Sequence, residues 1–295
     1  MFVGEIAALG TACLWGLSTY MHTNAAKLIG AWPLTLCRTP LVLFYNICIA
    51  LIIGTEWVFP SQSVGWILLS GVLGLGVADT LFYEGCTRIG ARTGSILWQM
   101  TPCVTAVIAF FALGESLTLI NIAGMLIIIG SVISITLKED EQSDTEVDPK
   151  EWRYGFKLVL VSVLALGLSH VCIRKGLSYG LDPLMGSILR IAAAASCAWI
   201  AAGVLGYHHK IMERKANMAK AMKIVFVASF VGTTLGNWVA LFSMKYAKAG
   251  IAASLISLTP LAIIMITAVH EKKTPSWRVI ASVLTACGGS ALLFI

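Results

Sequence analysis

Residues 74–115 read GLGVADTLFYEGCTRIGARTGSILWQMTPCVTAVIAFFALGE, and this stretch decides the fold. It predicts the end of one apolar helix, a tight basic connection and a second helix that closes on Gly114-Glu115. The pattern recurs at residues 232–271 as GTTLGNWVALFSMKYAKAGIAASLISLTPLAIIMITAVHE. A recurrence of this length indicates that the chain contains two copies of one structural unit.

The composition of the chain indicates a membrane protein. Apolar residues make up 58% of its 295 residues and charged residues only 12%, with a mean hydropathy of +0.85. A water-soluble core of this size cannot sequester so much apolar surface. The net charge of +6 does not point to nucleic acid, because most lysines and arginines fall in short connections between apolar runs. We therefore expect a multi-pass protein of a plasma membrane or a bacterial inner membrane, with the lipid bilayer as its surroundings and no nucleic-acid partner.

Ten runs are long enough to cross about 30 Å of hydrocarbon, at roughly 20 residues each. They lie at about 3–22, 32–54, 64–86, 92–113, 118–137, 153–173, 183–206, 222–244, 249–269 and 276–294. The predicted fold class is therefore all-α, with ten transmembrane helices. An acidic connection at 138–152 divides the spans five and five, which predicts one five-helix repeat at 1–137, a linker, and a second five-helix repeat at 153–295.

The two halves overlay residue by residue. An offset of 158 carries Thr101-Pro102 onto Thr259-Pro260, and it also carries Gly74 onto Gly232, Asp79 onto Asn237 and Gly130 onto Gly288. Earlier in each half, at offsets near 151, Trp15-Gly16-Leu17-Ser18 meets Leu166-Gly167-Leu168-Ser169, and Arg38 meets Arg190. Because five spans are an odd number, the second copy enters the membrane from the opposite side. Such an inverted repeat is the usual frame of alternating-access transporters.

A set of short motifs in the first half resembles a known family. They are Leu14-Trp15-Gly16, Arg38, Thr87-Arg88-Ile89-Gly90-Ala91, Thr101-Pro102 and Gly114-Glu115. In this order, with ten spans and a duplication, they resemble the EamA-type members of the drug/metabolite transporter superfamily over essentially the whole chain. The resemblance implies a ten-helix basket in which helices one to four and six to nine surround a central cavity, while five and ten are peripheral. The second half departs from the pattern, with Lys245 to Gly250 in place of the basic turn and His270-Glu271 in place of Gly-Glu.

Nothing in the sequence indicates an enzyme. It contains no GxSxG, HExxH, paired CxxC or phosphate-binding loop. The eight cysteines lie almost entirely inside apolar stretches, which is typical of small buried hydrophobic side chains. We expect no catalytic residue, no cofactor and no metal site.

Asp79 is the most informative polar residue. An ionised aspartate near the middle of a membrane helix costs about 2.5–3.5 kcal/mol, so its side chain has to be buried against protein, hydrated in a cavity or protonated. Tyr83 follows four residues later on the same helix face. Substrate contact or proton coupling is one interpretation of Asp79, and a structural pair with an arginine or a neighbouring helix is the other. If the protein carries protons, the absence of charge on Asn237 at the equivalent position favours Asp79 over its counterpart as the carrier.

Arg38 and Arg190 occupy equivalent positions in two predicted spans. For each, an ion pair that stabilises the bundle and contact with an anionic part of a substrate are equally consistent with the sequence. The other substrate-binding candidates are polar or aromatic residues on helix faces that could line the cavity: Trp15, Thr19, His22, Trp98, Gln99, His170, Asn237, Trp238, Ser254 and Ser257. For the face that carries Trp15, Thr19 and His22, packing against neighbouring helices is an equally open interpretation. Pro102 and Pro260 each remove a backbone hydrogen bond, which predicts helix kinks beside the cavity. Near the membrane surface, Glu84 and Arg88 are spaced for an i,i+4 ion pair.

These observations predict a secondary active transporter, an exporter or exchanger, that moves a small organic, amino-acid-like metabolite by alternating access. Protons or a counter-substrate are its candidate coupling partners. Two alternatives stay open: a membrane scaffold or sensor that transports nothing, and a transporter of a lipid-linked or nucleotide-sugar substrate. The sequence leaves the oligomeric state open.

The charge count and the family resemblance disagree about orientation. Fourteen lysines and arginines fall in the odd-numbered connections and four in the even-numbered ones. The positive-inside rule then places both termini outside, whereas the superfamily resemblance implies that both are inside.

Overall fold

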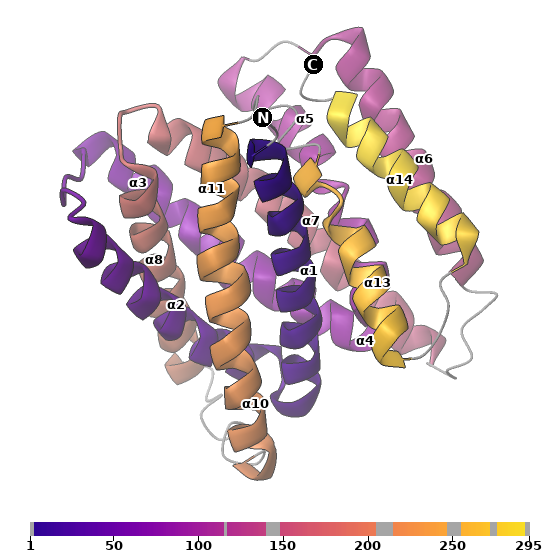
Figure 1. Ribbon diagram of the computed structural model, residues 1–295, viewed down its shortest axis with the longest axis horizontal. Coiled ribbons are helices and arrows are strands. Elements are labelled where there is room, and N and C mark those ends of the chain that lie inside the picture. The colour runs from indigo at the N-terminus through magenta and orange to yellow at the C-terminus, as the bar shows by residue number, and fades with distance from the viewer. Residues whose placement is uncertain are drawn as a thin grey trace.

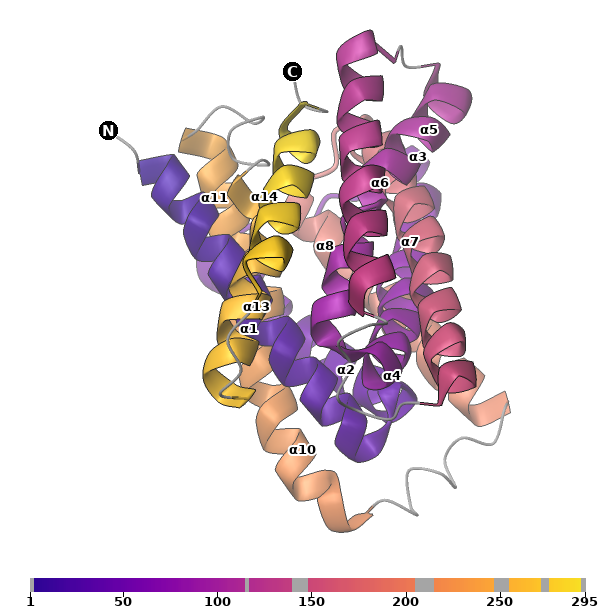
Figure 2. The ribbon, with the colours of Figure 1, turned by 90° about the vertical axis from the view of Figure 1, so that its right-hand side faces the viewer.

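The computed structural model describes residues 3–114, 117–139, 148–204, 215–246, 255–271 and 276–292. All regular secondary structure in these ranges is helical, and the helices form one bundle with the N- and C-terminal ends of the chain at the same end of it (Figures 1 and 2). The all-helical class predicted from the sequence is therefore confirmed for the described residues.

The helices of the first half follow the predicted spans. They are α1 (Val3–Ile29), α2 (Ala31–Ile53), α3 (Ser61–Ser70), the π-helix η1 (Gly71–Ala78), α4 (Asp79–Trp98), α5 (Thr101–Leu113) and α6 (Leu119–Glu139). α3, η1 and the first part of α4 run on without a break and together form the third predicted span. α1 continues seven residues beyond its predicted end at residue 22.

The second half repeats this order. Its helices are α7 (Pro149–Leu177), α8 (Pro183–Val204), α10 (Lys215–Ala228), the π-helix η2 (Ser229–Gly236), α11 (Asn237–Tyr246), α13 (Thr259–Glu271) and α14 (Trp277–Leu292). α7 begins inside the predicted linker, where Asp148 caps it by accepting a hydrogen bond from the Lys150 backbone N–H.

The connection between the third and fourth spans is made at Gly90. Its φ of 83° lies in the left-handed region, which a residue without a β-carbon adopts at little cost. The fourth span is itself divided, because Gln99 and Met100 form a turn before α5 begins. Pro102 then stands in the first turn of α5, and Pro260 takes the same place in α13. Proline is tolerated there because the first helical N–H groups have no acceptor within the helix.

Five helical stretches are long and apolar enough to cross a membrane, judged by length and composition in the described part of the chain. They are 31–53, 61–98, 149–177, 183–204 and 217–240. Four shorter apolar helices lie at Thr101–Leu113, Leu119–Ser131, Thr259–His270 and Trp277–Leu292. The predicted number of ten membrane crossings therefore stays a prediction.

α6 and α14 pack along one another at one side of the bundle (Figure 1). Their backbones come close at two glycines: a β-carbon added at Gly124 would lie 2.7 Å from the carbonyl oxygen of Gly289, and one added at Gly289 would lie 2.8 Å from that of Gly124. This contact joins the fifth helix of each half directly. The remaining helices form the body of the bundle.

An approximate two-fold relation appears where the first helix of each half crosses a π-helix of the other half. The Ser18 hydroxyl donates to the Ala228 carbonyl (2.9 Å), and the Ser169 hydroxyl donates to the Ser70 carbonyl (2.8 Å). Both π-helices begin one residue after these carbonyls, and they span equivalent residues at the offset of 158. Because a π-turn seldom forms without tertiary support, its presence at equivalent places indicates that the crossing itself imposes it.

Glycines make both crossings possible. A β-carbon added at Gly74 would lie 2.5 Å from the Ser169 hydroxyl oxygen, and one added at Gly232 would overlap Ser18. A second pair works in the same way: Gly16 packs on Ala262 of α13 and Gly167 on Val104 of α5, which are equivalent residues. Two of the matched glycine pairs, Gly74 with Gly232 and Gly16 with Gly167, therefore mark places where the repeats touch.

Candidate functional site

A buried ion pair joins α2 to α4. The Arg38 Nη2 atom lies 2.7 Å from the Asp79 carboxylate, and the side chains are 4% and 16% exposed. Asp79 is the first residue after η1, so the crossing of η1 with α7 fixes its position. A buried charge is stable only when it is paired and hydrogen-bonded. Of the two interpretations of Asp79, the structure shows the pair with an arginine, and a role in substrate binding or coupling stays a proposal.

His22 and Tyr83 extend this pair into a network. The Arg38 guanidinium lies 5.4 Å from the centre of the Tyr83 ring, and the Tyr83 hydroxyl lies 3.3 Å from His22 Nδ1. His22 is fully buried and also contacts the hydroxyls of Ser18 (3.2 Å) and Ser229 (3.5 Å). In this conformation His22 therefore links α1, α4 and η2, and its side chain lines no open space.

Arg190 is the equivalent of Arg38, but its surroundings differ. It is half-buried, and its Nη2 atom lies 3.3 Å from the place that a β-carbon on Gly74 would occupy. Its Nε atom is buried without a hydrogen-bond partner. Within the described ranges, no acceptor is hydrogen-bonded to its guanidinium, and the sequence position equivalent to Asp79 is held by Asn237. Its electrostatic partner is Asp79, which already pairs with Arg38.

His170 lies beside Arg190, close enough for the two side chains to interact electrostatically. Its Nδ1 atom lies 3.5 Å from the Thr105 hydroxyl of α5. His170 is exposed, although it stands nine residues after Val161, an exposed residue on the outer face of α7. Nine residues are two and a half helical turns, so His170 lies on the opposite, inward side of α7. Its exposure is therefore to space inside the bundle.

Gln99 connects the two halves at their equivalent turns. Its side-chain amide donates to the Ser257 carbonyl at 2.8 Å, and Ser257 is the residue equivalent to Gln99 itself. The Cys287 thiol donates to the same carbonyl at 3.1 Å. The carbonyl is available because the chain turns at Ser257 and Leu258 before α13 begins. Gln99, which is only 8% exposed, therefore joins the turn before α5 to the turn before α13 by a hydrogen bond in this conformation.

The remaining candidates lie around this centre. Trp15 packs edge-on against Gly236, and Trp98 packs on Phe82 with ring centres 4.2 Å apart. Three more are half-buried: Thr19, Asn237 and Trp238. Ser254 lies outside the described residues. Most of the sequence-predicted polar residues thus fall into three groups: a network at Arg38, the partly exposed Arg190 and His170, and a link at Gln99.

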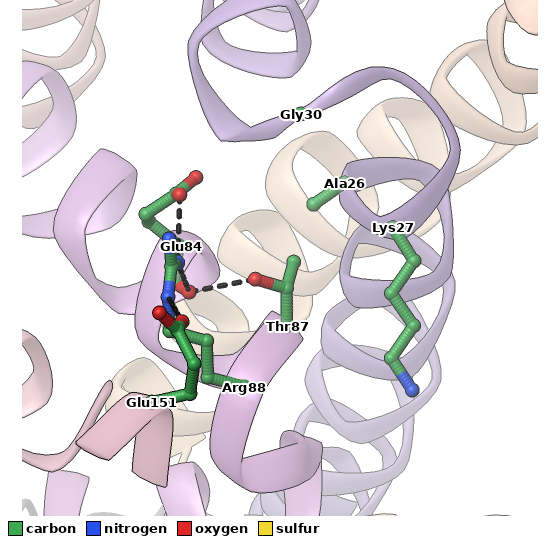
Figure 3. Close-up of a pocket in the computed structure, with 7 residues that line it drawn as sticks. All are labelled: Ala26, Lys27, Gly30, Glu84, Thr87, Arg88 and Glu151. Atoms are coloured by element: carbon green, nitrogen blue, oxygen red, sulfur yellow. Dashed lines mark hydrogen bonds and ion pairs between the residues drawn. The ribbon is translucent and has the colours of Figure 1, made fainter. Parts of the chain in front are cut away.

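A surface pocket of about 360 Å³ lies at one end of the bundle, away from these groups (Figure 3). Arg88 stands on one wall, donating to Glu84 (2.7 Å) and to Glu151 of α7 (2.9 Å), and Lys27 of α1 lies on the other. The predicted i,i+4 pair of Glu84 and Arg88 is confirmed. Its third member was not predicted, because Glu151 is 63 residues away in the sequence.

Sequence reasoning did not assign a role to several residues that hold the site together. Ser18, Ser169 and Ser229 contact the π-helices or His22, and a Thr35–Thr80 hydrogen bond of 2.7 Å lies next to the Arg38 pair. For Ser18 and Ser169 a signal existed, because they match across the repeats. The sequence alignment did not show that each would meet the matched glycine of the opposite repeat.

These features define a class: a helical membrane protein built from two repeats, with buried charged residues where the repeats meet. The model of the EamA-like transporter family matches residues 2–137 and 153–295, and the chain belongs to this family. It is therefore a multi-pass membrane transporter of the drug/metabolite transporter superfamily. A solved structure described only as "Crystal structure of protein" is similar in fold, with a TM-score of 0.65 and 14% identity over 98% of this chain and 95% of the other. A search of curated proteins gives no match.

Proposed function

We propose that the protein is a secondary active transporter, an exporter or exchanger, that moves a small organic, amino-acid-like metabolite by alternating access between its two repeats. The reciprocal crossing of α1 with η2 and of α7 with η1 carries this proposal. Equivalent contacts in the two halves allow each half to adopt the conformation of the other at similar free energy. Such an exchange opens the site first to one side of the membrane and then to the other.

The inward-facing polar groups support a substrate site between the repeats. His170 and Arg190 come from α7 and α8, and both retain exposure on sides that face other helices. Polar and charged side chains at membrane depth are costly unless they serve binding, transport or a structural pair. Arg38 and Asp79 form a structural pair with each other. Arg190 and His170 are therefore the candidates for substrate binding or transport.

Asp79 is the proposed site of proton coupling. Protonation of its carboxylate removes the charge that neutralises Arg38, and it thereby weakens the contact between α2 and α4. Because Asn237 cannot titrate, only the first repeat has this switch. In proteoliposomes, Asp79→Asn is expected to lose the response to a proton gradient while exchange of substrate for substrate continues. An unchanged response to the gradient contradicts the assignment.

Transport itself is tested with purified full-length protein in liposomes loaded with amino acids, organic acids or amines. We expect accumulation of at least one labelled compound against its gradient when a proton gradient or a counter-substrate is supplied. Liposomes that move none of them contradict the proposal. The same assay with lipid-linked sugars and nucleotide sugars tests the alternative cargo.

A second candidate, a scaffold or sensor without transport, has one observation in its favour. Several polar side chains at the centre of the bundle bond to other parts of the protein: His22 bonds within its network, and Gln99 bonds to the Ser257 carbonyl. A scaffold should keep binding its partners when Asp79→Asn and Gln99→Ala are combined, apart from the stability that the two lost contacts cost. A transporter should lose its transport rate with the same pair of substitutions.

A further inference from the structure

Arg38 and Arg190 are equivalent in sequence, but only one has an acidic partner. The Arg38 guanidinium contacts Asp79 and the Tyr83 ring, and the side chain is 4% exposed. The Arg190 guanidinium contacts a glycine, and no hydrogen bond from it is found within the described ranges. At the sequence position equivalent to Asp79, the second repeat has Asn237, which carries no charge.

Arg190 is partly exposed on a side of α8 that faces other helices. Gly74 presents no side chain to Nη2, and the Arg190 side chain as a whole is half-buried. Arg190 stands nine residues before the exposed Trp199, so it faces away from the outer surface of α8. Its Nε atom is covered, which means that its remaining exposure is at other atoms of the side chain, including the guanidinium nitrogens.

The charges around Arg190 set the sign of that ligand. Arg38, Asp79 and Arg190 together carry one net positive charge, and His170 adds hydrogen-bonding capacity beside it. An unpaired cation away from water is unfavourable. A single anionic group neutralises it, and a carboxylate matches the planar guanidinium with two parallel hydrogen bonds.

We propose that Arg190 binds the carboxylate of the transported substrate, with His170 at the edge of the same site, so that the cargo is an organic acid or amino acid rather than an amine. This inference rests on the proposed transport function, because only that function makes the bound ligand the transported substrate. Asp79 does not take the place of the substrate carboxylate at Arg190, because the Asp79 carboxylate is hydrogen-bonded to Arg38. The Thr105 hydroxyl orients the His170 ring from α5.

Matched pairs of acids and amides test the proposal by their effect on thermal unfolding of the purified full-length protein. Suitable pairs are lactate and lactamide, benzoate and benzamide, and phenylalanine and phenylalaninamide. We expect at least one acid to raise the unfolding temperature while its amide does not, because only a ligand that binds the folded state stabilises it. Arg190→Gln should weaken the apparent affinity for that acid at least about tenfold, and Arg190→Lys should weaken it less, because it keeps the charge but not the planar fork.

Arg153→Gln is the control, because it removes the same charge from an exposed position at the start of α7. It should leave the acid response unchanged. The inference is overturned if no acid stabilises the wild type, if acid and amide act equally, if Arg190→Gln keeps the full response, or if sulfate and chloride act as strongly as every carboxylate. A counterflow assay in liposomes distinguishes failure of this inference from failure of the proposed transport function. If an acid binds through Arg190 but is not moved across the membrane, only the transport function is contradicted. If the acid is moved equally well by the Arg190→Gln variant, only the carboxylate site is contradicted.

Discussion

The interior arginines of the two repeats have the same framework and different electrostatics. Both follow a first helix that crosses a π-helix through a serine and a glycine, and the hydrogen bonds of these crossings agree to within 0.1 Å. Arg38 nevertheless has Asp79 at 2.7 Å, whereas Arg190 has Asn237 in the equivalent place. The comparison teaches that equivalent positions beside equivalent crossings do not give the two arginines equivalent partners: Arg38 is paired with an acid, and Arg190 has no hydrogen-bonded acceptor within the described residues.

The largest effect is expected when the paired arginine is removed. Arg38→Gln leaves the Asp79 carboxylate buried without its partner, which costs about 3–5 kcal/mol of folding free energy. Thermal unfolding in detergent should show a large fall in the unfolding temperature. Adding Asp79→Asn removes the stranded charge, so the double variant should recover much of the loss. If the double variant is as unstable as the sum of the two single variants, the pair is not coupled as the structure shows.

The glycine crossings come next. Gly232→Ala is expected to cost about 1–3 kcal/mol, because the added β-carbon meets both Cβ and Oγ of Ser18. Gly74→Ala should cost less, because its closest neighbour is the Ser169 hydroxyl, which can rotate. Gly130→Ala and Gly288→Ala are the matched controls: these residues are also equivalent, and an added β-carbon at either has no neighbour within 4 Å. Equal effects at all four glycines contradict the crossing geometry.

A smaller effect is expected at the link between the equivalent turns. Gln99→Leu removes one of two donors to the Ser257 carbonyl and should cost about 1 kcal/mol. Combining it with Cys287→Ala leaves that carbonyl without either donor, so the double variant should lose more than the sum of the single variants. Strict additivity, measured by thermal unfolding, would show that the two donors do not share an acceptor.

The smallest effect on stability is expected at the unpaired arginine. Arg190→Gln removes no hydrogen bond or ion pair within the described part of the chain, so the free energy of unfolding should change by less than about 1 kcal/mol in either direction. The difference in unfolding free energy between Arg190→Gln and Arg38→Gln measures how much more the paired arginine contributes to stability than the unpaired one. Destabilisation by Arg190→Gln as large as that by Arg38→Gln means that the two arginines have the same structural role.

Much of the framework could be predicted from local patterns. Apolar run lengths predicted where the helices lie, and the Glu84–Arg88 pair followed from i,i+4 spacing, which is fixed within one helix. The turn at Gly90 could be placed for a similar reason, because the chain there changes from apolar to basic and contains glycine. The π-helices were not predicted, since their register depends on a contact with another helix rather than on their own composition.

The candidate site was predicted only as a set of residues. Arg38 and Arg190 could not be told apart, because each had the same two interpretations and the partner of Arg38 lies 41 residues away. For His22 the sequence left a cavity wall and a packed helix interface equally open, and the fold brings Tyr83 and Ser229 to it and buries it completely. Gln99 was expected to face a substrate, and the structure shows it bonded to the opposite repeat.

The sequence by itself determined the class of the protein, its duplication and the residues that correspond between its halves, because hydropathy and repeat offsets are properties of the chain alone. Only the tertiary structure decided which arginine is neutralised and which is open, and that each matched serine meets a matched glycine of the other repeat. The physical reason is that pairing and burial depend on distances between helices far apart in the chain. Those distances are set by glycine contacts that carry no side chain to reveal their partners.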